Sequence, residues 1–229
     1  TAVGALTLAA SLAVASPKVV GYIPAYKDMK MAVDTVDLSK LTHLTLAFIN
    51  PNAQGEFIDA SNNPLCMSGQ LGTDVSYVVQ KAQAEGVKVL AAIAGGVVPS
   101  CSSNAIWEDV LEADKRGTVV DNLMGFVDEF NLDGIDIDIE GGLLMTVSGR
   151  DSNGNNIASK PDNYTAFVDE LGDRLHAQGK LLTVATATWS GGSIPTASIE
   201  HFDFVSIMIY DAIGPTWGSP GVEHSSYSM

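Results

Sequence analysis

Residues 131–140 read Asn-Leu-Asp-Gly-Ile-Asp-Ile-Asp-Ile-Glu, and this stretch decides the fold. In its second half three acidic residues, Asp136, Asp138 and Glu140, alternate with isoleucines. A period of two predicts a β-strand, in which alternate side chains share one face. Alternate residues lie about 6.5–7 Å apart along a strand, so the three carboxyls repel one another unless they share protons or bind a positive partner. Because such crowding costs stability, we interpret it as serving chemistry.

Two simpler interpretations of this acidic run stay open. An edge strand with a solvated acidic face has the same alternation. Clustered carboxylates also suit a hard cation such as calcium, although the run lacks the glycine that the helix-loop-helix calcium motif needs. We expect no metal and no cofactor.

Asp133 and Gly134 extend the run to the pattern Asp-x-x-Asp-x-Asp-x-Glu, ending at Glu140. This pattern resembles the signature of glycoside hydrolase family 18, the chitinases and their relatives. Further features of the chain are similar to those of the family, in the same order along the sequence. They are Gly21-Tyr22, Ala47-Phe48 and Met208-Ile209-Tyr210-Asp211.

Apolar runs and helical patterns alternate along most of the chain. The runs, which predict buried strands, are 18–26, 41–50, 87–95, 132–140, 180–188 and 204–210. The helical patterns are 75–85, 118–130 and 163–178, the last with a capping pair at Asp162-Asn163 and a left-handed cap at Gly179.

Strands that alternate with helices indicate a parallel sheet, either doubly wound or closed into a barrel. A nucleotide-binding doubly wound sheet has a glycine-rich turn after its first strand, whereas this chain has Pro24-Ala25-Tyr26-Lys27. We therefore predict an α/β fold, a (β/α)₈ TIM barrel, with Glu140 at the carboxyl end of a strand, where such barrels carry their active sites.

Six strands are two fewer than the barrel needs, and 229 residues fall short of the typical length of about 250. We therefore expect a barrel truncated after about six strands, in a chain that is a fragment of a longer reading frame. Residues 1–16 are apolar and end in Ala13-Val14-Ala15, as in the remnant of a secretory signal peptide, although an N-terminal helix remains an alternative. The catalytic domain is then 17–229, and we expect it to be secreted.

The net charge of the chain excludes some classes of binding partner. The net charge of −15 argues against nucleic acid and anionic membranes, which would repel the chain, whereas a neutral polysaccharide is compatible. About 16 apolar residues are too few for a comfortable membrane span, so we expect no membrane insertion. We expect a monomer.

Cys66 and Cys101 are the only cysteines. In an exported protein they can form one disulfide between the loops after the second and third strands. Two unpaired thiols are the alternative.

The resemblance implies a retaining mechanism assisted by the substrate, an exception to the usual two-carboxylate scheme. Glu140 would be the general acid and then the base for water, its pKa raised by the nearby charge of Asp138. Asp138 would accept the acetamido N–H and share a proton with Asp136. Tyr210 would donate to the acetamido oxygen. Asp133 would be structural, or would support the other acids.

The resemblance also implies substrate contacts for Tyr22, Met208, Asp211 and Trp217, although one residue seems inserted before the tryptophan. Trp189, after the fifth strand, is either a sugar platform or a packing residue. Gly95 and Gly96 match the structural glycines at the end of the third strand. There the family usually has Ser-x-Gly-Gly, whereas this chain has Ile93-Ala94-Gly95-Gly96, so it lacks the serine that hydrogen-bonds the buried acids.

The function that the resemblance implies is hydrolysis of β-1,4 bonds between N-acetylglucosamine units, in chitin or chitooligosaccharides. An endo-β-N-acetylglucosaminidase acting on N-glycan cores is one alternative. A catalytically silent chitinase-like carbohydrate-binding protein is another. The retention of Glu140, Asp138 and Tyr210 together favours an enzyme.

Overall fold

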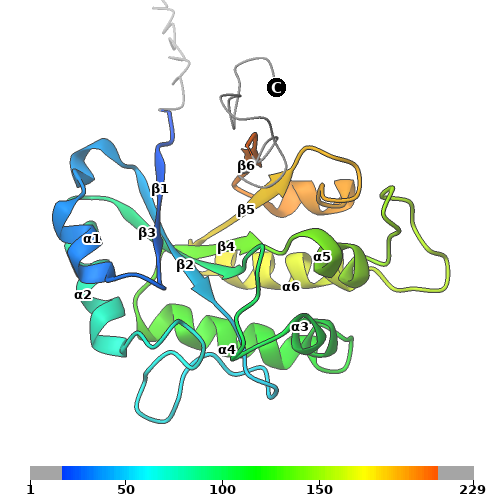
Figure 1. Cartoon of the computed structure of the whole chain (residues 1–229), viewed down its shortest axis with the longest axis horizontal. Helices are drawn as coiled ribbons and strands as arrows, with labels where there is room; N and C mark the ends of the chain where they lie inside the picture. Colours follow the sequence, from blue (N-terminus) through cyan, green and yellow to red (C-terminus); the bar gives the residue numbers. More distant parts are fainter. Residues whose placement is uncertain (1–16, 211–229) are drawn as a thin grey trace, which may run out of the picture.

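The computed structural model describes residues 17–210, and its centre is one sheet of six parallel strands (Figure 1). Neighbouring strands in the sheet follow the order of the chain. The strands are β1 Val20–Pro24, β2 His43–Ile49, β3 Lys88–Ala94, β4 Gly134–Asp138, β5 Leu181–Ala187 and β6 Phe204–Met208. Each lies inside one of the six predicted apolar runs, so the predicted order of strands is confirmed.

Within the described part of the chain, six α-helices and two short 3₁₀ helices connect the strands. The α-helices are α1 Met29–Thr35, α2 Gly72–Ala84, α3 Asn104–Val110, α4 Arg116–Glu129, α5 Gly141–Val147 and α6 Asn163–Ala177, and the 3₁₀ helices are η1 Leu38–Lys40 and η2 Thr196–His201. The three predicted helices correspond to α2, α4 and α6. The caps of α6 are also confirmed, because Asp162 accepts a hydrogen bond from the backbone N–H of Thr165 and Gly179 has φ of +68°.

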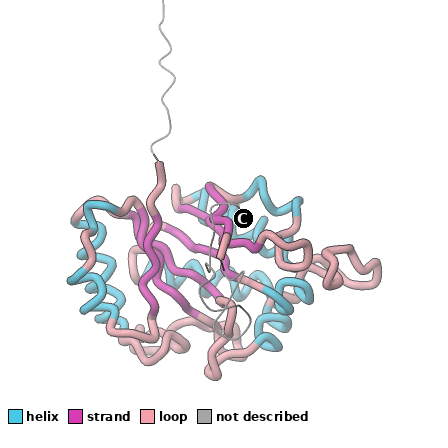
Figure 2. Tube along the Cα trace, turned by 45° about the horizontal axis from the view of Figure 1, so that its top comes forward, coloured by secondary structure: helices cyan, strands magenta, loops and turns pink. Residues whose placement is uncertain are grey.

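The helices flank the sheet and cover one of its faces (Figures 1 and 2). Ile135 and Ile137 of β4 are fully buried in the same apolar core as Phe167 and Leu171 of α6. Because side chains alternate along a strand, the acidic residues of β4 point to the opposite face. The apolar core therefore fixes the direction in which the acids point.

The sheet curls so that its last strand approaches its first two. The rings of His43 in β2 and Phe204 in β6 lie with centroids 5.2 Å apart, and the amino group of Lys18, just before β1, is 5.4 Å from the centroid of the Phe204 ring. These contacts join β6, at one end of the strand order, to β2 and to the residues just before β1, near the other end. The described residues thus form six of the eight strands of a (β/α)₈ barrel, as predicted.

A disulfide joins the loops that follow β2 and β3. Cys66 and Cys101 are bonded, with their Cα atoms 5.6 Å apart. Of the two alternatives that the sequence leaves open, the disulfide is therefore the correct one. It ties together two loops on the side of the sheet where the strands end.

Between residues 17 and 210, no helix has the length and apolar character that crossing a bilayer requires. The expected signal-peptide remnant, residues 1–16, lies outside the described part of the chain, as do residues 211–229.

Candidate active site

Asp136 lies in the middle of β4, Asp138 is its last residue and Glu140 lies two residues beyond it. Asp136 and Asp138 are almost fully buried, with 2% and 4% of their surface exposed. Glu140 follows in extended conformation, with φ of −125° and ψ of 165°, and is the residue before the first turn of α5. The extended backbone continues the strand's alternation, so Glu140 follows Asp138 on the same face.

A cavity of about 480 Å³ opens beside these acids. Its lining comes from the ends of β1, β2, β4, β5 and β6, and consists of Tyr22, Pro24, Tyr26, Ala47, Phe48, Asp138, Glu140, Ala185, Ser206, Ile207, Met208 and Tyr210. Five of the residues predicted for the site are among them: Tyr22, Asp138, Glu140, Met208 and Tyr210. The wall is therefore mostly apolar and aromatic, with two carboxyl groups at one side.

Asp136 lies below this cavity and receives a hydrogen bond on each carboxyl oxygen. The hydroxyl of Tyr22 donates to Oδ2 at 2.6 Å, and the hydroxyl of Thr183 in β5 donates to Oδ1. Burial raises the pKa of Asp136, while these two hydrogen bonds act in the opposite direction. Thr183 was not predicted from the sequence, where its only signal is a polar residue within the apolar run 180–188.

Asp138 has a different environment. Its pKa is raised to about 8, first by burial and then by the charges of Asp136 and Glu140. Among the described residues, no group forms a hydrogen bond with its Oδ1 atom, which is buried. Asp136 and Asp138 therefore titrate as a pair that still binds a proton at neutral pH.

Asp133 lies at the opposite end of β4 from the cavity. Its Oδ2 atom accepts hydrogen bonds from the backbone N–H of Val89 and from Gln83, and Lys88 lies 3.5 Å from its Oδ1 atom. These contacts tie the beginning of β4 to β3 and α2. The position fits the structural role expected for Asp133.

Gly95 and Gly96 follow β3 and adjoin the cavity. Gly95 has φ of +93°, and a Cβ atom there would come within 2.8 Å of the Phe48 ring. A Cβ atom on Gly96 would lie 3.4 Å from Oε1 of Glu140. Only glycine at position 95 lets the Phe48 ring pack against the backbone beside the cavity.

The register of β3 and β4 shows which residue of β3 lies beside Asp136. A hydroxyl side chain at that position could reach the buried acids. Ile93 is in register with Ile137 and belongs to the apolar core, whereas Ala92 is in register with Asp136. The residue beside Asp136 is therefore Ala92, which offers no hydrogen-bond donor from its side chain. The sequence alone pointed to position 93, one residue too far.

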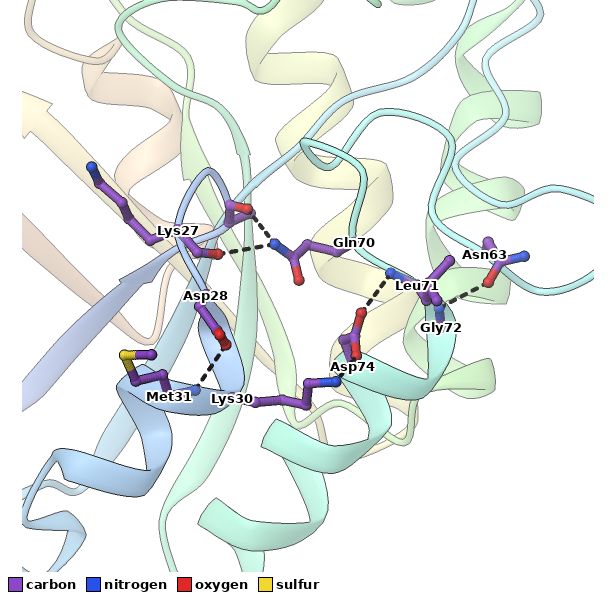
Figure 3. A network of polar contacts seen from close by, with 10 residues as sticks. Lys27, Asp28, Lys30, Met31, Asn63, Gln70, Leu71, Gly72 and Asp74 are labelled. Atoms are coloured by element: carbon purple, nitrogen blue, oxygen red, sulfur yellow. Dashed lines mark hydrogen bonds and ion pairs between the residues drawn. The ribbon is translucent and has the colours of Figure 1, made fainter.

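The loop after β1 carries Tyr26, whose largely exposed ring lies at the edge of the cavity. Gln70, just before α2, donates hydrogen bonds to the carbonyl oxygens of Ala25 (2.6 Å) and Lys27 (3.0 Å), on either side of Tyr26 (Figure 3). In the same network Lys30 of α1 pairs with Asp74 of α2 at 2.6 Å. These contacts fix the backbone that presents Tyr26, and sequence patterns give no sign of them.

Two predicted substrate contacts, Asp211 and Trp217, lie outside the described residues. The ring of Trp189 is half exposed and packs over the backbone of Gly191 and Gly192, where Cβ atoms would come within 2.4 Å of it. Within residues 17–210, no group of three or more His, Cys, Asp or Glu side chains is arranged to hold a metal ion.

Parallel β/α units with acids gathered where the strands end are the arrangement in which barrel enzymes carry their active sites. The sequence profile described as Glycosyl hydrolases family 18 matches residues 18–227, and the chain belongs to this family. The resemblance seen in the sequence is thus confirmed.

Individual relatives agree with this assignment. The "Secreted chitinase LysM12" of Penicillium expansum is 27% identical over 212 residues, covering 89% of this chain and 13% of that protein. A "chitinase-like effector" of Moniliophthora roreri is 27% identical over 208 residues, covering 86% of this chain and 46% of that protein. The crystal structure of the GH18 chitinase ChiB of Flavobacterium johnsoniae superposes with a TM-score of 0.70 at 28% identity, covering 92% of this chain and 60% of that chain. The chain thus spans less than two thirds of each relative's length.

Proposed function

We propose that this chain carries the catalytic acids of a chitinase-type hydrolase, which cleaves β-1,4 bonds between N-acetylglucosamine units. The observation that carries the proposal is a single cavity lined by Asp138, Glu140 and Tyr210 together. Membership of family 18 supports the class of reaction. The names of the relatives support chitin or its oligosaccharides as the substrate.

In the first step, the carboxyl group of Glu140 donates its proton to the glycosidic oxygen, and the bond from that oxygen to the anomeric carbon breaks. The acetamido carbonyl oxygen of the same sugar forms a new bond to that carbon, which gives an oxazolinium ion. In the second step Glu140 accepts a proton from water, whose oxygen attacks the anomeric carbon and reopens the ring. Two inversions at one carbon retain its configuration.

Asp138 accepts the acetamido N–H and so orients the carbonyl oxygen for attack. Its unpartnered Oδ1 atom supports this role, because a buried acceptor without a donor is costly until a ligand supplies one. The charge that the Asp136–Asp138 pair retains then balances the positive charge of the oxazolinium ion. Tyr210 holds the acetamido oxygen in line with the anomeric carbon, a positioning effect that can lower a barrier by several kcal/mol.

The shape of the cavity supports a sugar ligand. Its volume of about 480 Å³ lies within the common range for small-molecule sites, roughly 300–1,000 Å³. Tyr22, Tyr26, Phe48 and Met208 give it aromatic and apolar walls, against which the apolar faces of sugars pack. A neutral sugar also avoids repulsion by a chain whose net charge is −15.

Export from the cell is part of the proposal. The disulfide between Cys66 and Cys101 supports it, because such bonds persist in oxidising compartments. The words "secreted" and "effector" in the names of two relatives point the same way.

The proposal is tested by release of a fluorophore from a chitooligosaccharide glycoside. We expect Glu140→Gln to lose about 10²–10⁴-fold in rate, the contribution of a positioned acid. Glu112→Gln, at an exposed position after α3, is the matched control and should keep the full rate. Equal rates for Glu140→Gln and the unaltered chain would refute the assignment of the acid.

A second candidate function is binding of chitin without turnover, favoured by the similarity to a chitinase-like effector. Equilibrium binding of chitopentaose separates the two. A chain that binds the sugar and releases no product under any tested pH is a binding protein. Release of product that Glu140→Gln abolishes identifies the enzyme.

A further inference from the structure

The indole ring of Trp189, just beyond the end of β5, lies flat on the backbone of two glycines. A Cβ atom on Gly191 would come within 2.4 Å of Cζ3 of the ring, and one on Gly192 within 2.4 Å of Cε2. These two ring atoms are opposite corners of the six-membered ring, so one face of the indole covers both glycines. The side chain is nevertheless 51% exposed, which leaves the other face open to solvent.

The turn that carries the ring is tied back to its own strand. The backbone N–H groups of Gly192 and Ser193 donate hydrogen bonds of 3.0 and 2.9 Å to the carbonyl oxygen of Trp189. The N–H of Ile194 then donates to the hydroxyl oxygen of Thr186, inside β5, at 3.0 Å. The backbone under the ring is therefore fixed at both of its ends.

A second loop, which follows α5, presses against this turn. The side chain of Arg150, only 8% exposed, donates from Nε to the hydroxyl oxygen of Ser148 at 2.8 Å and from Nη2 to the carbonyl oxygen of Ser193 at 2.7 Å. The backbones also meet directly, because a Cβ atom on Gly154 would lie 2.5 Å from the carbonyl oxygen of Ser190. A ring held in this way loses little conformational freedom when a ligand covers it.

The surroundings of the ring are polar but carry little charge. No charged residue occurs between Lys180 and Glu200, although the whole chain has a net charge of −15. The acid of the facing loop, Asp151, accepts hydrogen bonds within that loop from two backbone N–H groups. The exposed side chains of the two loops next to the ring carry hydroxyl or amide groups: Thr188, Ser190, Ser152 and Asn153. An open aromatic face among neutral hydrogen-bonding groups suits a neutral sugar, whose apolar face stacks on the ring.

Trp189 lies on the side of the sheet where the cavity opens, but it is not part of the cavity wall. Ala185 of β5 lines the cavity, and Trp189 follows four residues later. Four extended residues span at most about 14 Å, so the ring lies within reach of an oligosaccharide that leaves the cavity. We propose that Trp189 is a stacking platform for a sugar unit outside the cavity, and that the protein therefore prefers longer oligosaccharides. The identity of the sugar, an N-acetylglucosamine oligomer, rests on the proposed function.

The first test compares a short and a long ligand, chitobiose and chitopentaose, by isothermal titration calorimetry. The Trp189 variants are made in a Glu140→Gln chain, so that slow turnover does not consume the ligand. We expect Trp189→Ala to weaken binding of chitopentaose about tenfold, the scale of one good aromatic contact, and binding of chitobiose less than twofold. Unchanged affinity for chitopentaose, or equal weakening for both sugars, would overturn the proposal.

Further variants separate stacking from a general loss of structure. Trp189→Phe keeps an aromatic ring and should retain part of the preference for chitopentaose. Gly192→Ala keeps the indole but places a methyl group against it, and the backbone at position 192 is not left-handed, so alanine fits there. We expect this variant to weaken chitopentaose several-fold. An unchanged affinity in Gly192→Ala would overturn the role of the glycines as the support of the ring.

Two matched controls lie far from the ring in the sequence. Gly125→Ala adds a methyl group in α4 with nothing within 4 Å of it. Tyr77→Ala removes a similarly exposed aromatic ring from α2. Both should bind chitobiose and chitopentaose as the unaltered chain does. A loss in Tyr77→Ala as large as in Trp189→Ala would contradict a specific platform.

Turnover separates the platform from the proposed function. On long chitooligosaccharides we expect Trp189→Ala to raise KM about tenfold and to leave kcat within twofold. If the unaltered chain releases no product while its binding of chitopentaose depends on Trp189, the platform stands and hydrolysis is refuted. If product release depends on Glu140 while Trp189→Ala changes neither binding nor KM, hydrolysis stands and the platform is refuted. Failure of the unaltered chain to bind either sugar would overturn both.

Discussion

The hydroxyl of Tyr22 in β1 donates a hydrogen bond of 2.6 Å to Oδ2 of Asp136 in β4, although two strands lie between β1 and β4 in the sheet. Only a strongly curled sheet brings these side chains within reach of each other. The same curl gathers the ends of five strands around one cavity. The fold and the chemistry of the buried acids therefore depend on one geometric property of the sheet.

Removing the Tyr22 hydroxyl should destabilise the protein and disturb the acids. We expect Tyr22→Phe to lower the free energy of unfolding by about 1–2 kcal/mol, because it leaves a buried carboxyl oxygen with one donor fewer. Tyr77→Phe is the matched control, since Tyr77 is equally exposed and donates to the exposed Asp34. Urea denaturation should show a smaller loss for Tyr77→Phe, and equal losses would count against a special role of the Tyr22 contact.

The raised pKa of Asp138, about 8, makes stability depend on pH. The folded state binds the proton more tightly than the unfolded state, whose Asp pKa is about 3.9. This contribution is complete below pH 4 and is lost as the pH rises through about 8, with a slope of up to about 1.4 kcal/mol per pH unit. We expect Asp138→Asn to lose less stability than the unaltered chain between pH 4 and 8, as measured by urea denaturation at each pH. Parallel curves for the two proteins would contradict the raised pKa.

Substitution of Gly95 by alanine tests how tightly the Phe48 ring packs beside the cavity. Alanine at position 95 combines a left-handed backbone with a contact of 2.8 Å to the Phe48 ring. Gly86 is the matched control, because it has φ of +76° and nothing within 4 Å of an added Cβ atom. We expect unfolding free energies to fall by about 1 kcal/mol in Gly86→Ala, from the backbone alone, and by about 2–4 kcal/mol in Gly95→Ala. Equal losses of unfolding free energy would mean that the Phe48 ring moves away from the added methyl group at no energetic cost.

The disulfide should contribute substantially to stability. Cys66 and Cys101 are separated by 35 residues, and closing a loop of that length in the unfolded chain is worth about 4 kcal/mol. We expect the double variant Cys66→Ser/Cys101→Ser to lose most of this amount in urea denaturation. Adding a reductant should destabilise the unaltered chain by a similar amount and leave the double variant unchanged. A reductant effect on the double variant would indicate another cause.

The strands could be predicted from the sequence because buried parallel strands are continuous apolar runs, and each run contains its strand. The helices α1, α3 and α5 could not, since seven residues make only two turns and give too short a period to recognise. Glu140 was assigned to the strand, whereas β4 ends at Asp138 and the extended backbone continues without pairing.

The candidate site was predictable only in part. The pattern from Asp133 to Glu140 identifies the acids, and similarity to the family adds Tyr22, Met208 and Tyr210, all three of which line the cavity. The hydrogen-bond donors of Asp136 depend on strand register and on the curl of the sheet. Neither of these can be predicted from a local sequence pattern. Thr183 was therefore missed, and the missing β3 hydroxyl was assigned to the wrong position.

The proposed mechanism is tested by ¹H NMR of the anomeric protons while the chain hydrolyses chitopentaose. We expect the first new reducing ends to be β-anomers that convert slowly to the α-form in solution, and we expect Glu140→Gln to produce none. Initial formation of the α-anomer, or equal product from Glu140→Gln, would contradict a mechanism in which Glu140 is the acid and the substrate's own acetamido group makes the displacement.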